Sequence, residues 1–252
     1  MGRSAVRKKK DRHFQPMPES VANMVVMDEY RQRTERKTPL FTYRYKFESR
    51  NERQEIMLKA INSNRNRVTF GIGAPGTGKT KVAVSSALKL VSTPGSKYGK
   101  IYITRPAVEA EGEKIGFLKG GIDEKMHPYF IPIYDILEEE LGVELFENLL
   151  KRKVIEIAPL AFLRGRTLKN AIVILDEMQN ATYGQIKMAL TRIGKNSKFI
   201  LTGDPSQSDR KGINGFMEAA NKLRTAPGYT IVDFLEEDVV RDDMVKVALE
   251  YL

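Results

Sequence analysis

The chain has 252 residues, of which 41% are hydrophobic and 29% are charged, the composition of a globular protein that buries its own core. It has no cysteine and two histidines, which excludes disulfides and thiol nucleophiles and argues against metal sites built from these residues. No run of 18 apolar residues and no signal-peptide pattern is present, so we expect a cytoplasmic protein without a membrane partner.

The net charge of +10 is concentrated near the N-terminus. Residues 1–50 hold thirteen Lys or Arg and six Asp or Glu, whereas the rest of the chain holds twenty-nine and twenty-six. We therefore predict a basic N-terminal arm over residues 1–50, partly disordered, followed by one domain over residues 51–252. A basic arm is typical of contacts with nucleic-acid phosphates. The alternatives are a solvated tail that aids solubility and a nuclear-import signal.

Two elements are expected before the first glycine-rich stretch. Residues 41–47 alternate aromatic with basic or polar side chains, which predicts a strand with one aromatic face. We interpret that face as part of the core, with base stacking as the alternative. A helix is predicted over residues 51–60, capped by Asn51.

Residues 73–80, GAPGTGKT, match the phosphate-binding P-loop pattern. They follow a predicted strand over residues 67–72 and precede a helical pattern over residues 82–90, which is the context that the motif needs. The backbone N–H groups of the loop would surround phosphate oxygens, Lys79 would reach the β- and γ-phosphates, and the Thr80 hydroxyl would bind Mg²⁺. The predicted nucleotide-binding residues are Gly73, Ala74, Pro75, Gly76, Thr77, Gly78, Lys79, Thr80 and Lys81.

The remaining elements alternate between strand and helix. A Gly- and Glu-rich loop is expected over residues 105–128, and several of the strand segments are too apolar for a sheet with one solvated face. This pattern predicts an α/β domain with a mainly parallel sheet covered by helices on both faces. The strands are expected at residues 100–104, 154–158, 171–175, 198–202 and 230–234, and the helices at residues 133–150, 183–190 and 214–223.

Polar residues follow two of these strands and suggest the chemistry. Asp176 and Glu177 close an apolar strand, which is the Walker B pattern. Asp176 would hold Mg²⁺ together with Thr80, and Glu177 would orient and deprotonate the attacking water. Gln207, backed by Asp204, is predicted to contact the γ-phosphate or that water. The guanine-reading pattern Asn-Lys-x-Asp is absent, so we expect ATP.

The chain resembles the PhoH family of P-loop ATPases, whose core is similar to the first motor domain of superfamily 1 helicases. The resemblance implies a RecA-like P-loop NTPase fold and ATP hydrolysis with Mg²⁺. Beyond the P-loop, it is carried by Thr104-Arg105-Pro106-Ala107-Val108-Glu109, Gly116-Phe117-Leu118, and residues 159–168 (PLAFLRGRTL), 174–180 (ILDEMQN), 202–207 (TGDPSQ) and 238–241 (DVVR).

The resemblance also assigns two glutamines. Gln54 matches the helicase-type glutamine that reads adenine, and Gln179 matches the position that links Walker B to the γ-phosphate or to nucleic acid. The family usually has His after Val-Val-Arg, whereas this chain has Asp242-Asp243.

Superfamily 1 helicases complete their active site with arginines from a second motor domain, for which we expect no room in this chain. We therefore hypothesise that a neighbouring subunit supplies the arginine, in a homo-oligomeric ring. The candidates, in order, are Arg241, Arg164 and Arg166, and ordinary structural ion pairs are the alternative for each.

The expected function is an ATPase that binds or remodels nucleic acid, with single-stranded RNA favoured. The alternative is a nucleotide-switched binding module that recruits a separate nuclease or a ribosome-associated partner. Nuclease activity of the chain itself has little support, because no His or Cys metal cluster is present.

Overall fold

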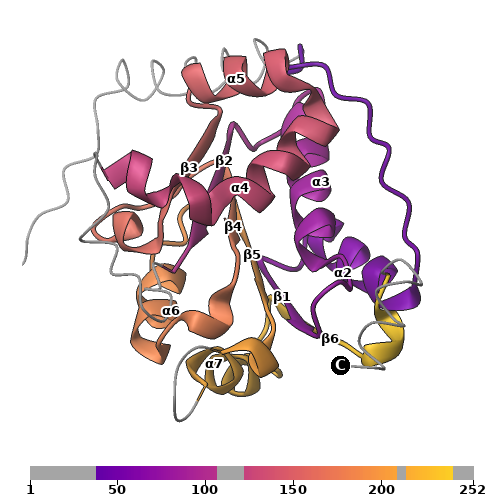
Figure 1. Cartoon of the computed structure of the whole chain (residues 1–252), viewed down its shortest axis with the longest axis vertical. Helices are drawn as coiled ribbons and strands as arrows, with labels where there is room; N and C mark the ends of the chain where they lie inside the picture. Colours follow the sequence, from indigo (N-terminus) through magenta and orange to yellow (C-terminus); the bar gives the residue numbers. More distant parts are fainter. Residues whose placement is uncertain (1–37, 107–121, 209–213, 241–252) are drawn as a thin grey trace, which may run out of the picture. The chain divides into compact units, whose positions relative to one another are not determined.

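The computed structural model describes residues 38–106, 122–208 and 214–240. Its strands form a six-stranded sheet in the order β3-β2-β4-β5-β1-β6, and every neighbouring pair is parallel (Figure 1). The predicted parallel sheet is therefore confirmed. The strands are β1 (Val68–Gly73), β2 (Lys100–Arg105), β3 (Ile155–Pro159), β4 (Ala171–Leu175), β5 (Ser197–Gly203) and β6 (Tyr229–Phe234).

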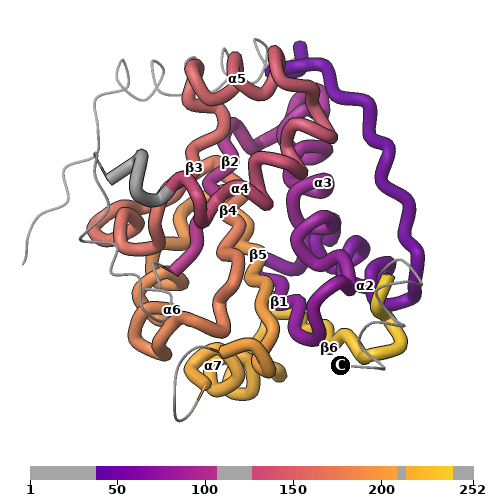
Figure 2. Tube along the Cα trace, viewed as in Figure 1, coloured from indigo at the N-terminus to yellow at the C-terminus, as the bar shows by residue number. Residues whose placement is uncertain are grey.

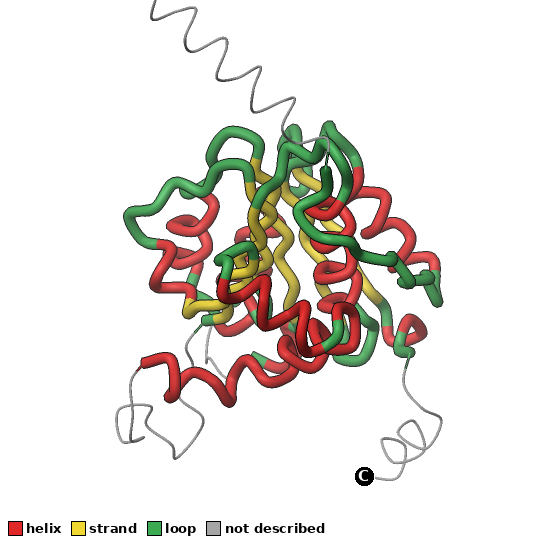
Figure 3. Tube along the Cα trace, turned by 90° about the horizontal axis from the view of Figure 1, so that it is seen from above, coloured by secondary structure: helices red, strands yellow, loops and turns green. Residues whose placement is uncertain are grey.

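The central strands are buried on both faces, which explains their continuous apolar sequence. Ile172 and Ile174 of β4 belong to one hydrophobic cluster, whereas Val173 and Leu175 belong to a second cluster on the opposite face. Successive side chains of a strand point to opposite faces, so an apolar run with no alternation must meet a helix layer on each side. Figure 3 shows helices flanking the sheet on both sides.

The helices divide between the two faces according to the cluster that they join. Side chains of α2, α3, α4 and α5 pack with Ile172 and Ile174, and those of α6 and α7 pack with Val173 and Leu175. None of the helices within the described ranges is long and apolar enough to cross a membrane. The helices are α2 (Glu52–Asn62), α3 (Lys79–Ser92), α4 (Ile122–Leu141), α5 (Val143–Lys151), α6 (Tyr183–Leu190) and α7 (Gly215–Leu223).

The single helix predicted over residues 133–150 is wrong, because two helices cover this stretch. Helix α4 begins at Ile122, inside the loop predicted over residues 105–128, and contains Pro128 and Pro132. Interior prolines cost a helix about 3 kcal/mol, so the sequence pattern favoured a start after them. Gly142, with φ of 78°, ends α4 and precedes α5, a position that glycine adopts without strain.

The strand predicted over residues 41–47 is also wrong, although its alternation is real. The segment is extended but pairs with no strand among the described residues. Phe41 is buried, Tyr43 and Phe47 pack against the same hydrophobic cluster as α3, and the Tyr45 ring lies 4.2 Å from Lys89 Nζ of α3. Figure 2 shows this segment running from beside α5 to the start of α2. The aromatic face therefore covers a helix instead of joining the sheet.

The segment that precedes α2 belongs to the compact unit that begins at Pro39. The basic arm predicted over residues 1–50 lies largely outside the described residues, which begin at 38.

A buried carboxylate, Glu140 of α4, joins this segment to α3. It accepts hydrogen bonds from the Tyr43 hydroxyl and from Ser85 Oγ at 2.8 Å, and Lys81 Nζ lies 3.2 Å away. Burial alone would raise the pKa of Glu140, yet these donors outweigh it and hold the pKa below its ordinary value. Burial and the same carboxylate raise the pKa of Tyr43. The cluster is therefore stabilised by the ionised form of Glu140.

We expect Glu140→Gln to lower the free energy of unfolding at pH 7 by about 1–3 kcal/mol, because a buried site loses its charged acceptor. The pKa of Glu140 is lower in the folded than in the unfolded chain, so its contribution is present above the unfolded pKa and is lost as pH falls through the folded pKa. The difference between wild type and variant should therefore shrink below the ordinary value of 4.5. Urea unfolding at pH 7 and at acidic pH measures both effects.

Glu139→Gln is the matched control. Its side chain is 71% exposed, against 4% for Glu140, although it also pairs with Lys81. An exposed pair contributes less than about 1 kcal/mol, so this variant should be close to wild type. Equal losses in the two variants would mean that pairing with Lys81, and not the buried acceptor, carries the stability.

Asn51 both caps α2, as predicted, and ties it to the C-terminal part of the described chain. Its Oδ1 accepts from the backbone N–H of Gln54 at 2.8 Å, and its Nδ2 donates to the backbone oxygen of Asp238 at 2.8 Å. A 3-10 turn at Glu236–Asp238 presents that oxygen. One side chain therefore fixes both the start of α2 and the segment after β6.

We expect Asn51→Ala to lower the free energy of unfolding by about 1–2 kcal/mol, because it removes a helix cap and leaves a partly buried carbonyl unpaired. Asn62→Ala is the control, since the Asn62 side chain bonds Leu58 O at the exposed end of the same helix. Urea unfolding compares the two. A loss in Asn51→Ala no larger than that in Asn62→Ala would contradict the double role.

Candidate active site

The P-loop connects β1 to α3 at the carboxyl edge of the parallel sheet, where α/β proteins bind ligands. The loop depends on glycine at two positions in particular. At Gly73, where φ is 141°, a Cβ atom would lie 2.2 Å from the backbone oxygen of Phe234. At Gly78, where φ is 78°, it would lie 2.7 Å from Gln54 Nε2. The loop therefore packs directly on β6 and α2, and the first turn of α3 follows it.

The Lys79 ammonium is held inside the loop. Its Nζ donates to the backbone oxygens of Gly73 at 2.8 Å and Ala74 at 2.6 Å, and to Thr77 Oγ1 at 3.0 Å. These neutral acceptors position a positive charge at the N-terminal end of α3. The charge and the helix dipole both favour an anion there.

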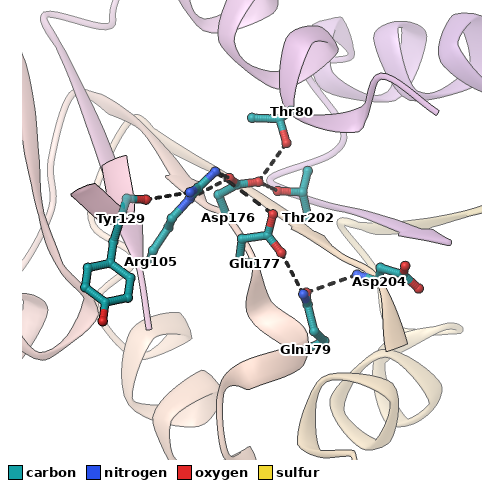
Figure 4. Close-up of polar contacts among 8 residues, drawn as sticks. All are labelled: Thr80, Arg105, Tyr129, Asp176, Glu177, Gln179, Thr202 and Asp204. Atoms are coloured by element: carbon teal, nitrogen blue, oxygen red, sulfur yellow. Dashed lines mark hydrogen bonds and ion pairs between the residues drawn. The ribbon is translucent and has the colours of Figure 1, made fainter. Parts of the chain in front are cut away.

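The register of the sheet brings three polar residues side by side. Leu175 of β4 pairs with Thr104 of β2 and with Leu201 of β5. The next residue along each strand, Asp176, Arg105 and Thr202, therefore lies at the same level of the carboxyl edge. Figure 4 shows these side chains converging.

Asp176 is the centre of this group and is 1% exposed. Its Oδ1 accepts from Thr80 Oγ1 at 2.8 Å and from the Thr202 hydroxyl, while its Oδ2 accepts from Arg105 Nε at 2.9 Å and Nη2 at 2.6 Å (Figure 4). The structure thus brings together the two predicted metal ligands, Thr80 and Asp176. Oxygen donors in this number fit Mg²⁺, which is held by one or two protein side chains together with phosphate oxygens. No group of three or more His, Cys, Asp or Glu able to hold a metal occurs among the described residues.

The position of Arg105 was not predicted from the sequence. Its Nη1 also donates to the backbone oxygen of Tyr129 in α4 at 2.6 Å, and its Nη2 lies 4.0 Å from Glu177 Oε1. A signal for it was present, because Arg105 is the polar residue that ends β2, next to the Walker B strand. This cation belongs to the same subunit as the P-loop.

Glu177 has an unusual backbone, with φ of 56° and ψ of 38°. A residue with a side chain in the left-handed region costs of order 1–2 kcal/mol, so the surrounding contacts must hold it. Its Oε2 accepts from Gln179 Nε2 at 2.6 Å, and Gln179 Oε1 accepts from the backbone N–H of Asp204 at 3.0 Å (Figure 4). A hydrogen-bonded relay therefore runs from the predicted general base to the loop after β5. The Glu177 carboxylate remains 44% exposed.

Two cavities flank the P-loop and share Gly76, Gly78 and Lys81. The smaller cavity, of about 250 Å³, is lined by all of the predicted catalytic and metal-binding residues within the described chain. The larger, about 680 Å³, lies toward α2 and the segment before it. The smaller cavity is lined further by Pro75, Lys79, Thr80, Ile136, Asp176, Glu177, Thr202, Gly203, Asp204 and Gln207, and the larger by Lys46, Phe47, Glu48, Ser49, Arg50, Gln54, Glu139, Glu140 and Val240.

Gln54 lines the larger cavity but already makes two hydrogen bonds. Its Nε2 donates to the backbone oxygen of Thr77 at 3.0 Å, and its Oε1 accepts from the backbone N–H of Arg50 at 2.8 Å. A glutamine amide has two N–H groups and two lone pairs on its oxygen, so one donor and one acceptor site of this buried side chain have no partner among the residues that the structure describes. These are the groups that a donor–acceptor edge such as that of adenine requires.

Of the three candidate arginines, the two that the structure describes, Arg164 and Arg166, do not lie at the P-loop of their own subunit. Arg241 lies outside the described residues, although the backbone N–H of Val240 donates to Gly76 O at 2.9 Å. Arg166 pairs with Glu156 at 2.5 Å, and Arg164 is exposed. Both follow β3, which is four strand spacings from β1, roughly 19 Å at about 4.8 Å each.

Comparisons with known proteins agree with the motifs. A family model described as "PhoH-like protein" matches residues 46–252. The PhoH-like protein of Bacillus subtilis (strain 168) is 49% identical over 188 residues, 74% of this chain and 58% of that protein. Protein PhoH of Escherichia coli (strain K12) is 40% identical over 205 residues, 80% of this chain and 56% of that protein. The chain spans a little over half the length of these curated relatives.

Among solved structures, the UvsW helicase from bacteriophage T4 aligns with a TM-score of 0.45 at 14% identity, covering 84% of this chain and 67% of that one. The SWI2/SNF2 ATPase core of Sulfolobus solfataricus aligns with a TM-score of 0.41 at 13% identity, covering 81% and 48%. The sheet, its two helix layers and the P-loop after β1 form a RecA-like P-loop NTPase fold. The extent of the family match and the identity to its members mean that this chain belongs to the PhoH-like protein family.

Proposed function

We propose that this protein is a Mg²⁺-dependent ATPase that uses ATP to bind or remodel nucleic acid, with single-stranded RNA as the favoured substrate. The observation that carries the proposal is the group of Thr80, Asp176 and Glu177 around the smaller cavity, with Lys79 beside it. A phosphate-binding loop, a buried metal-binding carboxylate and an exposed general base are the parts that phosphoryl transfer to water requires.

Each residue has a separate task in this proposal. Lys79 exchanges the carbonyls of Gly73 and Ala74 for phosphate oxygens, which are stronger acceptors because they are charged. Thr80 and Asp176 would hold Mg²⁺, which would neutralise charge on the triphosphate. Glu177 accepts a proton from the attacking water.

The relay through Gln179 supports a general-base role for Glu177. A catalytic carboxylate needs a fixed direction, and the hydrogen bonds from Gln179 to Glu177 and from Asp204 to Gln179 supply it. Gln207 lines the same cavity on the loop that carries Asp204, so it can contact the γ-phosphate or the water. Loss of the γ-phosphate would thereby change the contacts of the loop after β5. Hydrolysis could be coupled to bound nucleic acid in this way.

The larger cavity is proposed to hold adenosine. Its lining includes Gln54, with one donor and one acceptor unused, and the Phe47 ring, a surface on which a base can stack. Contacts from residues 46–50 would make nucleotide binding depend on the segment before α2.

The nucleic-acid part of the proposal is supported by charge and by motif. The chain carries a net charge of +10, and the Walker B segment continues into Gln179, the helicase-type coupling position. We also propose a homo-oligomeric ring in which an arginine acts on the neighbouring P-loop. Arg164 supports it, because it is exposed at the β3 edge, far from its own phosphate site.

Glu177→Gln is expected to reduce ATP turnover by about 100-fold or more, because the amide cannot accept the proton, while ATP binding stays within about tenfold of wild type. Turnover is measured with and without single-stranded RNA and DNA, and again without Mg²⁺. Glu147→Gln, an exposed glutamate of α5, is the control and should turn over ATP like wild type.

The outcome separates the alternatives. Turnover that rises several-fold with nucleic acid and is lost in Glu177→Gln supports the motor. Turnover that ignores nucleic acid favours a nucleotide-switched module that recruits a nuclease or a ribosome-associated protein. Turnover of Glu177→Gln equal to wild type would contradict the assignment of the base.

If the protein forms a ring, two variants that are each inactive should regain activity when they are mixed. Arg241→Ala or Arg164→Ala should lose about 1,000-fold in turnover while still binding ATP, because the transition-state charge lacks its cation. Mixing the arginine variant with Glu177→Gln should restore part of the activity, since some interfaces then pair an intact arginine with an intact Glu177. Arg44→Ala, another exposed arginine, is the control. Full activity of a monomer at high dilution would refute the ring.

A further inference from the structure

A separate cavity of about 300 Å³ lies at the amino-terminal edge of the sheet. Its walls come from the residues just before β1, just before β2 and at the start of β5. Because the strands are parallel and each rises about 3.3 Å per residue, six residues of β1 put this cavity roughly 20 Å from the P-loop. The lining residues are Asn64, Asn66, Arg67, Lys97, Tyr98, Lys195, Asn196, Ser197 and Lys198.

The cavity is strongly positive. Four of its lining residues, Arg67, Lys97, Lys195 and Lys198, are cationic, and the described lining includes no carboxylate. Three of the cations are exposed, and each alone would be an ordinary solvated side chain. Together they surround a concave site with the amides of three asparagines and the Ser197 hydroxyl as further polar groups.

Lys198 distinguishes this cavity from a group of surface lysines. It is only 3% exposed, and its Nζ donates to the backbone oxygens of Ser63 and Asn66, each at 2.7 Å. An ammonium has three N–H donors, so one is left without a partner within the described part of the chain. Buried charges are normally paired with an opposite charge, and here two neutral carbonyls take that place.

The burial and the positive surroundings of Lys198 change its pKa. Burial, together with the charges of Lys97 and Arg67, lowers its pKa to about 8. Lys195 and the buried Tyr98 also line the site, and neither supplies a negative charge at neutral pH. A bound anion would relieve this repulsion.

The remaining contacts favour phosphate over a base. Arg67 is fixed by its bonds to Gly194 O at 2.5 Å and to Ser197 O at 3.2 Å, which holds its guanidinium in place before any ligand binds. The Tyr98 ring is buried with Lys97 Nζ 5.3 Å from its centre, so it offers no open face for base stacking. The site presents N–H donors and positive charge but no aromatic platform.

We propose that this cavity binds a phosphate group, belonging either to a polynucleotide backbone or to a small phosphate compound. The site is distinct from the nucleotide site at the opposite edge of the sheet, so it does not depend on the proposed ATPase activity.

The test uses the full chain with Lys97→Glu and Lys195→Glu combined. Both side chains are exposed, so the substitutions should not disturb folding, whereas replacing the buried Lys198 could. Arg44→Glu combined with Lys151→Glu changes the net charge equally at two exposed positions that do not line the cavity and is the matched control. One arm measures binding of a fluorescent 20-nucleotide oligouridylate over a range of salt. The other measures binding of inorganic phosphate by calorimetry with ADP and Mg²⁺ present.

If a polynucleotide backbone occupies the cavity, the pocket variant should bind the oligouridylate about tenfold more weakly than the control. Its slope of log K against log salt should also fall in magnitude by about 0.7 for each lost phosphate contact. If a small phosphate occupies it, the oligouridylate arm is unchanged and phosphate binding is lost in the pocket variant alone. Equal behaviour of pocket variant and control in both arms overturns the proposal. Basal ATP turnover should be the same in both variants, so a failed ATPase assay and a failed phosphate test remain distinguishable.

Discussion

The structure depends on one buried carboxylate, Asp176, and on the four hydrogen bonds that it accepts. Thr80 and Thr202 bind one oxygen and Arg105 binds the other, so the P-loop helix, β5 and β2 are all attached to the end of β4. A buried carboxylate is stable only when such donors surround it. The contacts that stabilise it are therefore the same contacts that assemble the site, and in the proposed ATPase some of them would be exchanged for contacts with metal and phosphate.

Arg105 is the residue that brings a positive charge to the two Walker B acids. Its two bonds to Asp176 and its distance of 4.0 Å to Glu177 place a cation next to both Walker B acids. That charge compensates the two acids, and in the proposed ATPase it would lie beside the metal that Asp176 and Thr80 are proposed to hold. A metal and a guanidinium repel each other, so Arg105 is the group whose position should respond most to nucleotide. Its bond to Tyr129 O would carry that response to α4.

Local sequence predicted those parts of the site that consecutive residues build. The P-loop, the β4 strand with Asp176 and the cap at Asn51 were found, because glycine spacing, an apolar run and a capping residue act over a few positions. The roles of Arg105 and Thr202 depend on which strands are neighbours, and that order is β2-β4-β5 only after folding. Residues 41–47 alternate as a strand does, yet their partner is α3, and no local pattern distinguishes a helix surface from a sheet. The start of α4 was missed because Pro128 and Pro132 have a low helix propensity, whereas packing stabilises the helix that contains them.

The distribution of charge between the two edges of the sheet follows from the same topology. At the carboxyl edge Lys81 and Arg105 pair with carboxylates, whereas Lys79 is held by neutral acceptors, so the positive charge at this edge is partly compensated. At the amino edge the partners and charged neighbours of Lys198, among the described residues, are carbonyls and other cations. The first edge therefore fits the proposed metal-bound triphosphate, and the second fits the proposed phosphate held by charge alone. Salt should weaken the second far more than the first, because contacts without a metal rely on displaced counterions.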